Sequence, residues 1–388
     1  MPHKRIRMLN KIAQNPFIKF IVSLRLTVIC LIVLSILTFW GTLYQVDHGL
    51  YPARARFFNS WVLFIWNFIP FPGTKLVIAV LSLNLIGSFF FRLRFAWKKI
   101  GILLVHFGIV FLFLAAGFTH YFASESYLSL HEGEQSRYSS SYRNWELLLY
   151  RTNKGNIKDE KSESFDLSSL TSGSRLIFPE SQIGVTVRKI YTNAAAPGGF
   201  DNPRSMHRHS SVDSLVELEP EKDPSKNVPG IICTVERQSS KQHTELMLHG
   251  RTKNSFTFED NDYSYALILQ PKRILLPLTL RLLDFTKEDY AGTEMARDFK
   301  SRIYAKGDNI DREVVISMNR PFRYNDFTFF QSSYSQQGRR ESSTFAVVRN
   351  SARQLPYIAS CLIMAGLLIH FLIKLIGGMK PVHRKKKD

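Results

Sequence analysis

The sequence predicts a membrane protein that combines α and β structure: four transmembrane helices and a large antiparallel β-rich extracytoplasmic domain, sandwich-like or barrel-like. Three observations predict this class. Four apolar stretches approach or exceed the length of about 20 residues that a helix needs to cross a bilayer. Between the third and fourth stretches lie about 230 mostly polar residues. That polar region contains many short β-rich runs with turn signals between them, which is typical of an antiparallel sandwich or barrel.

The four apolar stretches lie at residues 20–43, 76–91, 100–122 and 355–376. The first follows a basic segment, but it is far longer than the apolar core of a signal peptide, about 7–15 residues, so we expect a retained anchor. Asn84 in the second stretch is expected to make an interhelical hydrogen bond. We expect an N-terminal membrane region of three helices at 1–122, an extracytoplasmic β-rich domain at 123–354, and the fourth helix with a basic cytoplasmic tail at 355–388.

The charge of the chain is concentrated beside the apolar stretches. The 388 residues include 51 Lys and Arg against 32 Asp and Glu, a net charge of +19, which raises the question of a nucleic-acid partner. However, residues 1–25, 92–99 and 374–388 together hold +15 of that charge. Short basic segments of this kind stay in the cytoplasm. We therefore expect membrane lipid and no nucleic acid as a partner, both termini in the cytoplasm of a bacterial cell, and residues 123–354 on the periplasmic side of its plasma membrane.

The strands expected in the polar region are short. They lie at residues 126–131, 145–150, 184–190, 214–218, 231–236, 255–258, 263–269, 278–283, 302–304, 313–318, 328–330 and 345–348. Residues 151–175 and 191–212 are rich in Ser, Asn and Lys, so we expect loops there. His207 and His209 in the second loop are expected to be solvated rather than metal-bound. The three cysteines of the chain include no CxxC pair, which argues against a disulfide scaffold and against thiol exchange.

The loop expected at residues 44–75 is dense in aromatic side chains. It contains two tryptophans and five phenylalanines: Trp61, Trp66, Phe57, Phe58, Phe64, Phe68 and Phe71. Aromatic residues gather where a bilayer meets water. The loop is therefore expected either as an aromatic belt that lies in the membrane interface, or as a hydrophobic platform for a flat ligand or a partner helix.

Three histidines lie within or at the ends of the apolar stretches, where ionisable groups are rare and are functional candidates. His106 lies about 10 Å into the third stretch, and His370 lies in the cytoplasmic half of the fourth. Because imidazole is a natural axial ligand of haem iron, these two are candidates to bind haem at similar depth. His120 follows His106 by fourteen residues, a spacing that suits two stacked haems. The alternative for each is a hydrogen bond to a neighbouring helix or a place at the interface.

Several stretches carry a common resemblance. They are SLRLTVICLIVLSILTFWGTLYQ (23–45), NLIGSFFFRL (84–93), GILLVHFGIVFLFLAAGF (101–118), LSLHEGE (128–134), LPLTLRLLDFTKEDYAGTEMARDFKSRIY (276–304) and ISMNRPFRYNDFTFFQSSYS (316–335). In this order, they resemble the ResB family, the membrane proteins of the system II pathway of cytochrome c maturation. Only about residues 151–255 lack recognisable matches.

The resemblance implies a CcsA-type haem-handling membrane protein as partner. The two are thought to move haem across the membrane and to attach it to the CxxCH cysteines of apocytochrome c. It implies that His106 is an axial ligand to the haem iron, whereas His370 has no firm counterpart in the family. Haem is then a transient cargo shared with the partner, and the chain is at most a non-catalytic or co-catalytic subunit of a haem lyase. No catalytic residue is expected, and thiol-reducing proteins act only indirectly.

Two other classes of function stay open. One is a b-type haem electron-transfer membrane protein that uses His106 and His120, which a redox-active haem surviving without the partner would favour. The other is a non-haem membrane-anchored scaffold or receptor whose outer β domain binds a ligand. A receptor is expected to carry a cytoplasmic signalling module, and the cytoplasmic segments expected here are short.

Overall fold

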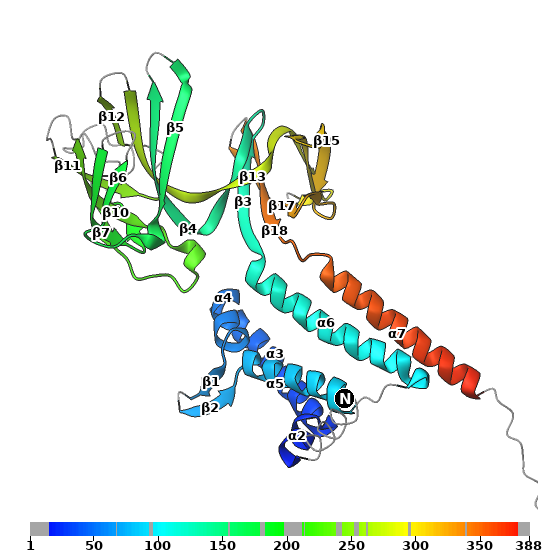
Figure 1. The fold of residues 1–388 in the computed structure, drawn as a ribbon. Coiled ribbons are helices and arrows are strands. Elements are labelled where there is room, and N and C mark those ends of the chain that lie inside the picture. The colour runs from blue at the N-terminus through cyan, green and yellow to red at the C-terminus, as the bar shows by residue number, and fades with distance from the viewer. Residues whose placement is uncertain are drawn as a thin grey trace, which may run out of the picture. The chain divides into compact units, whose positions relative to one another are not determined.

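The chain folds into two compact units, Met1–Ala123 with Asn350–Asp388 and Ser124–Arg349. The computed structural model describes residues 15–66, 68–92, 96–153, 156–178, 183–197, 212, 214–237, 243–251, 256–260, 263–293, 296–337 and 340–378. The first unit is almost all helical and the second almost all strand (Figure 1). The predicted class, membrane α plus β, is therefore confirmed. Much of the basic sequence at both termini, together with His207 and His209, lies outside the described residues.

Helices make up most of the first unit. They are α2 (Pro16–Ile21), α3 (Leu24–His48), α4 (Leu50–Ala53), η1 (Arg54–Phe58), α5 (Thr74–Gly87), η2 (Ser88–Arg92), η3 (Trp97–Lys99), α6 (Ile100–Phe122) and α7 (Leu355–Gly378). Four spans, Leu24–His48, Thr74–Phe91, Ile100–Phe122 and Leu355–Ile376, are long and apolar enough to cross a bilayer. At most 17% of each span is buried. Apolar side chains exposed along four such helices indicate a membrane protein.

The first membrane helix begins four residues later than predicted and continues further. Ser23 caps α3, with its hydroxyl accepting from a backbone amide of the first turn, and the separate helix α2 precedes it. The buried side chain of Asn84 on α5 holds this junction. It donates to the carbonyl oxygens of Ile21 and Ser23 and accepts from Thr27 Oγ1 at 2.7 Å. The predicted interhelical hydrogen bond of Asn84 is therefore confirmed.

Strands make up most of the second unit. They are β3 (Ser124–His131), β4 (Gln135–Asn153), β5 (Asn156–Asp166), β6 (Arg175–Phe178), β7 (Ile183–Tyr191), β8 (Ala194–Ala195), β9 (Val216–Glu217), β10 (Gly230–Arg237), β11 (His243–His249), β12 (Phe256–Asp260), β13 (Tyr263–Asp289), β14 (Ala296–Gly307), β15 (Ile310–Ser317), β16 (Phe322–Tyr324), β17 (Phe327–Gln337) and β18 (Arg340–Arg349). A ten-stranded sheet has the path β15-β14-β13-β4-β3-β18-β17-β16, with β12 and β5 beside it, and a four-stranded sheet has the order β11-β10-β7-β6. The strands pair antiparallel, as the turn-rich pattern predicts.

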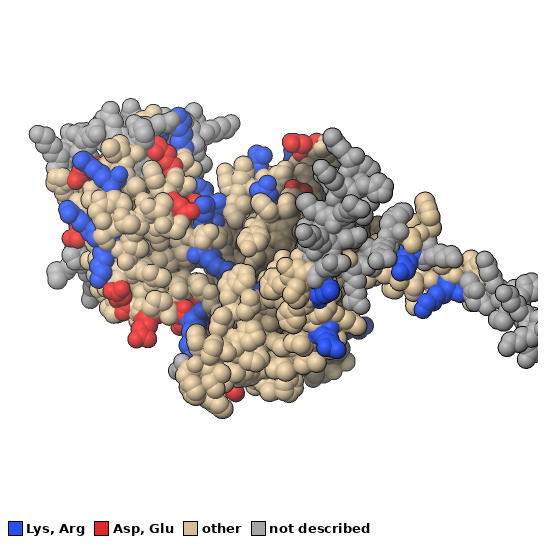
Figure 2. Space-filling view, turned by 60° about the horizontal axis from the view of Figure 1, so that its bottom comes forward, with Lys and Arg blue, Asp and Glu red and all other residues tan. Residues whose placement is uncertain are grey.

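This β unit has two hydrophobic cores. The first is formed by β4, β6, β7, β10, β11 and the first part of β13, with Val187, Ile231 and Leu267 fully buried. The second is formed by β3, β14 to β18 and the later part of β13, with Leu280 and Phe345 fully buried. Strand β13 therefore belongs to both cores and connects them (Figure 1). On the face that Figure 2 shows, acidic and basic side chains of this unit are mixed.

Two expectations about the β unit differ from the structure. Residues 151–175 were expected as a loop, but β5 and the end of β4 occupy most of that range. Among the residues that the structure describes, strand β5 pairs only with β4, which makes it an edge strand there. Its polar residues lack the alternating apolar pattern by which a strand is recognised. Residues 263–269 and 278–283 were expected as separate strands, but both belong to β13. Register shifts after Pro271 and after Leu275 let the strand continue across two prolines.

His249 gives the β unit a testable pH dependence. Its buried ring donates from Nε2 to the Ala194 carbonyl (3.0 Å) and accepts at Nδ1 from the Arg251 amide (3.3 Å). Burial lowers the pKa of His249 below its usual 6.5. The unfolded chain therefore binds a proton at a pH where the folded chain does not. We expect the free energy of unfolding to fall as the pH drops below about 6.5, by at most about 1.4 kcal/mol per pH unit.

Thermal unfolding of the full chain at about pH 7.5 and pH 5.5 measures this effect. His249→Gln keeps a polar side chain at the site but cannot titrate, so its unfolding is expected to depend less on pH than that of the unchanged protein. Equal pH dependence in the two proteins would contradict the assignment.

Candidate functional site

Helices α6 and α7 pack side by side through small residues (Figure 1). Gly101, Gly108 and Ala115 recur every seven residues on α6, and all three are buried. Added carbon atoms would find no room: a Cβ on Gly101 would lie 2.5 Å from His370 N, and one on Gly366 would lie 2.8 Å from Val105 N. Small residues at such an interface let two helix backbones approach closely. The pair therefore forms a tight antiparallel contact within the membrane unit.

His106 lies on α6 and is half-buried. Its Nδ1 lies 2.9 Å from the carbonyl oxygen of Ile102, one turn earlier. Because a carbonyl oxygen can only accept, Nδ1 must carry the proton. In the neutral ring the lone pair then lies on Nε2, and a metal-binding histidine has the same arrangement, with one nitrogen held by a carbonyl and the other free for the metal. The tautomer of His106 with its proton on Nδ1 therefore fits an axial ligand of haem iron.

His106 faces away from α7. At 3.6 residues per turn it lies about 140° around α6 from Gly101, the residue that contacts α7. Phe113 lies seven residues later on the same face as His106, and it packs against a cluster formed by residues of α3 and α5, including Val77 and Leu81. His106 therefore lies on the face of α6 that carries Phe113, on the side of α3 and α5.

The other two candidate histidines are not brought to His106. The backbone of His370 lies against Gly101, which is five residues, or about 7.5 Å, from the level of His106 along the helix pair. His120 is exposed in the last turn of α6, where its ring contacts Tyr121 at 5.3 Å between centroids. Among the described residues, neither imidazole has a hydrogen-bond partner to fix its tautomer. Among the residues that the structure describes, His106 is thus the one of these three histidines whose ring is held by a hydrogen bond.

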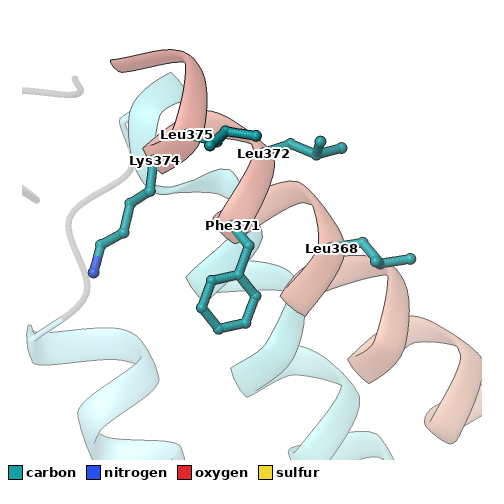
Figure 3. A pocket seen from close by; sticks show the side chains of 5 residues that line it. All are labelled: Leu368, Phe371, Leu372, Lys374 and Leu375. Carbon is teal, nitrogen blue, oxygen red and sulfur yellow. The ribbon is translucent and has the colours of Figure 1, made fainter. Parts of the chain in front are cut away.

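The last turns of α7 carry a shallow apolar groove. It is lined by Leu368, Phe371, Leu372, Lys374 and Leu375. The leucines and Phe371 lie along one stretch of the helix, and the Lys374 side chain extends away from Leu368 and Leu372 (Figure 3). A lysine that carries its charge away from an apolar helix surface is typical of a membrane-helix end. We assign no ligand to this groove.

Sequence reasoning missed a second histidine-containing cluster, at the end of α3. The ring of His48 stacks on Tyr44, with 3.9 Å between centroids and 6° between planes. The guanidinium of Arg56 lies over the same tyrosine at 5.2 Å. Tyr44 and His48 are four residues apart, which places them on one helix face, so this spacing was the available signal. The stack orients His48 at the helix end and leaves it exposed.

The buried thiol and the buried carboxylate of the β unit have structural surroundings. In the part of the chain that the structure describes, no group of three or more His, Cys, Asp or Glu side chains could hold a metal ion. All three cysteines are free, and burial raises the pKa of the Cys233 thiol to about 12. Glu146 is buried and pairs with Arg273 at 3.0 Å. A protonated thiol and a paired carboxylate both serve the fold of the unit.

One region of the chain, which includes strands β13 to β18, is similar to a known protein family. Residues 239–359 match the ResB-like family, and they extend from the β unit into α7 but include none of the three candidate histidines. No curated protein matches the chain. The family fits a general role in cytochrome c biogenesis. The similarity to the ResB-like family therefore covers residues 239–359, about a third of the chain.

Proposed function

We propose that this chain is the membrane subunit of a system II cytochrome c maturation complex, and that it helps to carry haem across the membrane for covalent attachment to apocytochrome c. Its partner is a CcsA-type haem-handling protein, and haem is a cargo shared between the two. The termini lie in the cytoplasm, and the β unit lies on the periplasmic side of a bacterial plasma membrane. There it positions apocytochrome c or the haem site of the partner.

The observation that carries this proposal is the orientation of His106. Its Nδ1 is held by the Ile102 carbonyl, so Nε2 is free to bind iron. The ring lies among apolar side chains of a membrane span, where an unpaired polar group is costly. Haem is flat and largely apolar, and its transport requires a ligand for iron and an apolar surface for the ring. His106 and the surrounding face of α6 supply both.

The chain contributes binding rather than thiol chemistry. Thioether formation needs reduced cysteines on apocytochrome c and ferrous haem, and the sequence contains no CxxC pair to reduce them. Thiol reduction therefore belongs to other proteins of the pathway. His120 and His370 have weaker support than His106 because neither ring is held by a hydrogen bond among the described residues.

Haem content measured with and without the partner tests the role of His106. We expect His106→Ala to lower the haem bound per purified complex at least about tenfold, since loss of a ligand's hydrogen-bond partner alone costs about 10–100-fold in metal affinity. Haem is quantified by absorbance after purification of the chain with and without a CcsA-type protein. His120→Ala removes an exposed imidazole from the same helix and is the matched control.

Adding imidazole distinguishes the loss of an iron ligand at residue 106 from a loss of folding. His106→Gly is expected to regain haem absorbance when imidazole is supplied, because the free base can occupy the space of the lost ring. Unchanged haem content in His106→Ala would remove the ligand assignment. A redox-active haem retained in full without the partner would favour the electron-transfer alternative.

A further inference from the structure

The segment between α3 and α5 forms a rigid aromatic hairpin. Strands β1 (Val62–Ile65) and β2 (Ile69–Pro72) pair antiparallel, with Leu63 opposite Phe71. The base of the hairpin is closed by two backbone hydrogen bonds, from Gly73 N to the Trp61 carbonyl (2.9 Å) and from Lys75 N to the Ser60 carbonyl (3.3 Å). A side chain at Gly73 would collide with Ser60. The hairpin is therefore fixed directly at the first turn of α5.

The two faces of the hairpin have different surroundings. Leu63, Ile65 and Phe71 pack against the cluster formed by α3, η1 and α5. The opposite face is uncovered, with Val62 44% and Phe64 51% exposed. At the tip, the backbone of Trp66 adopts the left-handed conformation (φ 51°), and Trp66 and Phe68 are 78% and 68% exposed. One face thus holds the hairpin in place, and the other presents apolar side chains outward.

No charged residue occurs from Ser60 to Gly73. A hairpin with large exposed aromatic side chains and no charge is not stable in water as an open surface, because such surfaces aggregate. The uncovered face therefore requires an apolar or interfacial neighbour.

The covalent connections of the hairpin place it at the bilayer surface. Helix α3 has 25 residues, or about 37 Å, which exceeds the hydrocarbon thickness of about 30 Å, so its end reaches the interface. Helix α5 begins at Thr74, directly after the hairpin. The exposed apolar band of α3 includes Phe39 (68%) and Val46 (81%) near this end. In Figure 1 the hairpin projects sideways from the helices near α4.

Basic side chains accompany the aromatic face. Arg54 and Arg56 lie in η1 and are exposed. Arg56 donates from Nη2 to the Phe64 carbonyl at 3.3 Å, and its guanidinium lies over the Tyr44 ring. An arginine held beside an aromatic interfacial surface matches the layered chemistry of a lipid headgroup region, in which phosphates lie above apolar chains.

We propose that the β1–β2 hairpin is a lipid anchor that lies in the bilayer interface. Trp66, Phe68 and Phe64 contact the glycerol and upper acyl region of the lipids, and Arg54 and Arg56 contact their phosphates. Tryptophan is enriched at this depth of the membrane because it combines an apolar ring with a polar N–H. The anchor fixes the end of α3, and with it the Tyr44–His48 stack, at a defined height. It is independent of whether the chain handles haem.

Tryptophan quenching in nanodiscs tests the anchor on the full chain. The emission of Trp66 is obtained by subtracting the tryptophan fluorescence of the Trp66→Phe variant from that of the unchanged chain. We expect lipids brominated on their acyl chains to quench this difference emission, and aqueous iodide to leave it unchanged. Trp145→Phe is the matched control, since Trp145 packs against the first core of the β unit, and we expect lipid bromine to leave its difference emission unchanged.

A second variant gives a gain of signal. Phe68→Trp introduced into Trp66→Phe is expected to restore the emission that brominated lipid quenches. Difference emission quenched by iodide and not by brominated lipid would show a tip in water and would overturn the proposal. Emission insensitive to both reagents would show a tip covered by protein, a partner or a second copy, and would equally overturn it.

Discussion

Gly366→Leu is expected to separate α6 from α7 and to destabilise the membrane unit by about 3 kcal/mol or more, at or above the usual upper range for overpacking. A Cβ at this position would lie 2.8 Å from Val105 N and 2.9 Å from the Gly101 carbonyl oxygen. Both are backbone atoms, so they cannot rotate away, and the whole of α6 would have to move. The measurements are the amount of folded chain in membranes and its thermal unfolding in detergent.

Gly117→Leu is the matched control on α6. A Cβ added to Gly117 would meet nothing within 4 Å, and leucine favours a helix over glycine by about 1 kcal/mol. We therefore expect Gly117→Leu to be as stable as the unchanged chain or slightly more stable. Equal stability of the two leucine variants would contradict the close α6–α7 contact.

The membrane spans could be predicted because lipid imposes one strong requirement. A spanning helix must be apolar over its whole length, and this requirement is visible in any window of the sequence. The partner of each helix is much less visible. The α6–α7 contact depends on Gly101 and Gly108, seven residues apart, whereas apolar side chains surround them on every face. Only the structure shows which of these faces meets α7, and consequently that His106 and His370 do not lie at one level.

The β unit was predictable in class and less so in detail. Strands with alternating apolar residues, such as β7 and β10, were expected at nearly their observed bounds. Strand β5 was missed because an edge strand has no need for a buried face along its whole length. Strand β13 was divided because Pro271 and Pro277 remove backbone donors, and a bulge that accommodates them depends on the neighbouring strand β4. The bounds of such strands therefore depend on pairing with strands far away in the sequence, which a local sequence pattern does not reveal.

A buried ion pair lies where the two cores of the β unit meet. Glu146 is on β4, just before the residues that enter the first core, and Arg273 is on β13, just before those that enter the second. Arg273 Nε donates to Glu146 Oε1 at 3.0 Å, and Gln270 Nε2 donates to the same oxygen at 2.9 Å. The side chain of Glu146 is 5% exposed. These two donors therefore satisfy a carboxylate oxygen to which water has little access.

Arg273→Met is expected to destabilise the paired strands β4 and β13 by about 3 kcal/mol in the free energy of local unfolding. The reason is that it leaves the buried carboxylate of Glu146 without its cation. A loss of that size corresponds to roughly a hundredfold faster amide hydrogen exchange in those strands, at about 1.4 kcal/mol per tenfold. Exchange measured by mass spectrometry on the full chain reports the two strands separately. The double variant Glu146→Leu with Arg273→Met removes both charges, so it is expected to recover to within about 1 kcal/mol of the unchanged chain.

Arg302→Met is the same substitution at an exposed ion pair. Arg302 lies 3.9 Å from Asp284 and from Glu313, and its side chain is 51% exposed. Solvent screens such pairs, so we expect a loss below about 0.5 kcal/mol. The contribution of an ion pair to the stability of this unit would then depend on its burial, rather than on the number of ion pairs. Equal losses of stability in Arg273→Met and Arg302→Met would contradict this expectation. They would mean that the ion pair of Glu146 does not stabilise the junction of the two cores.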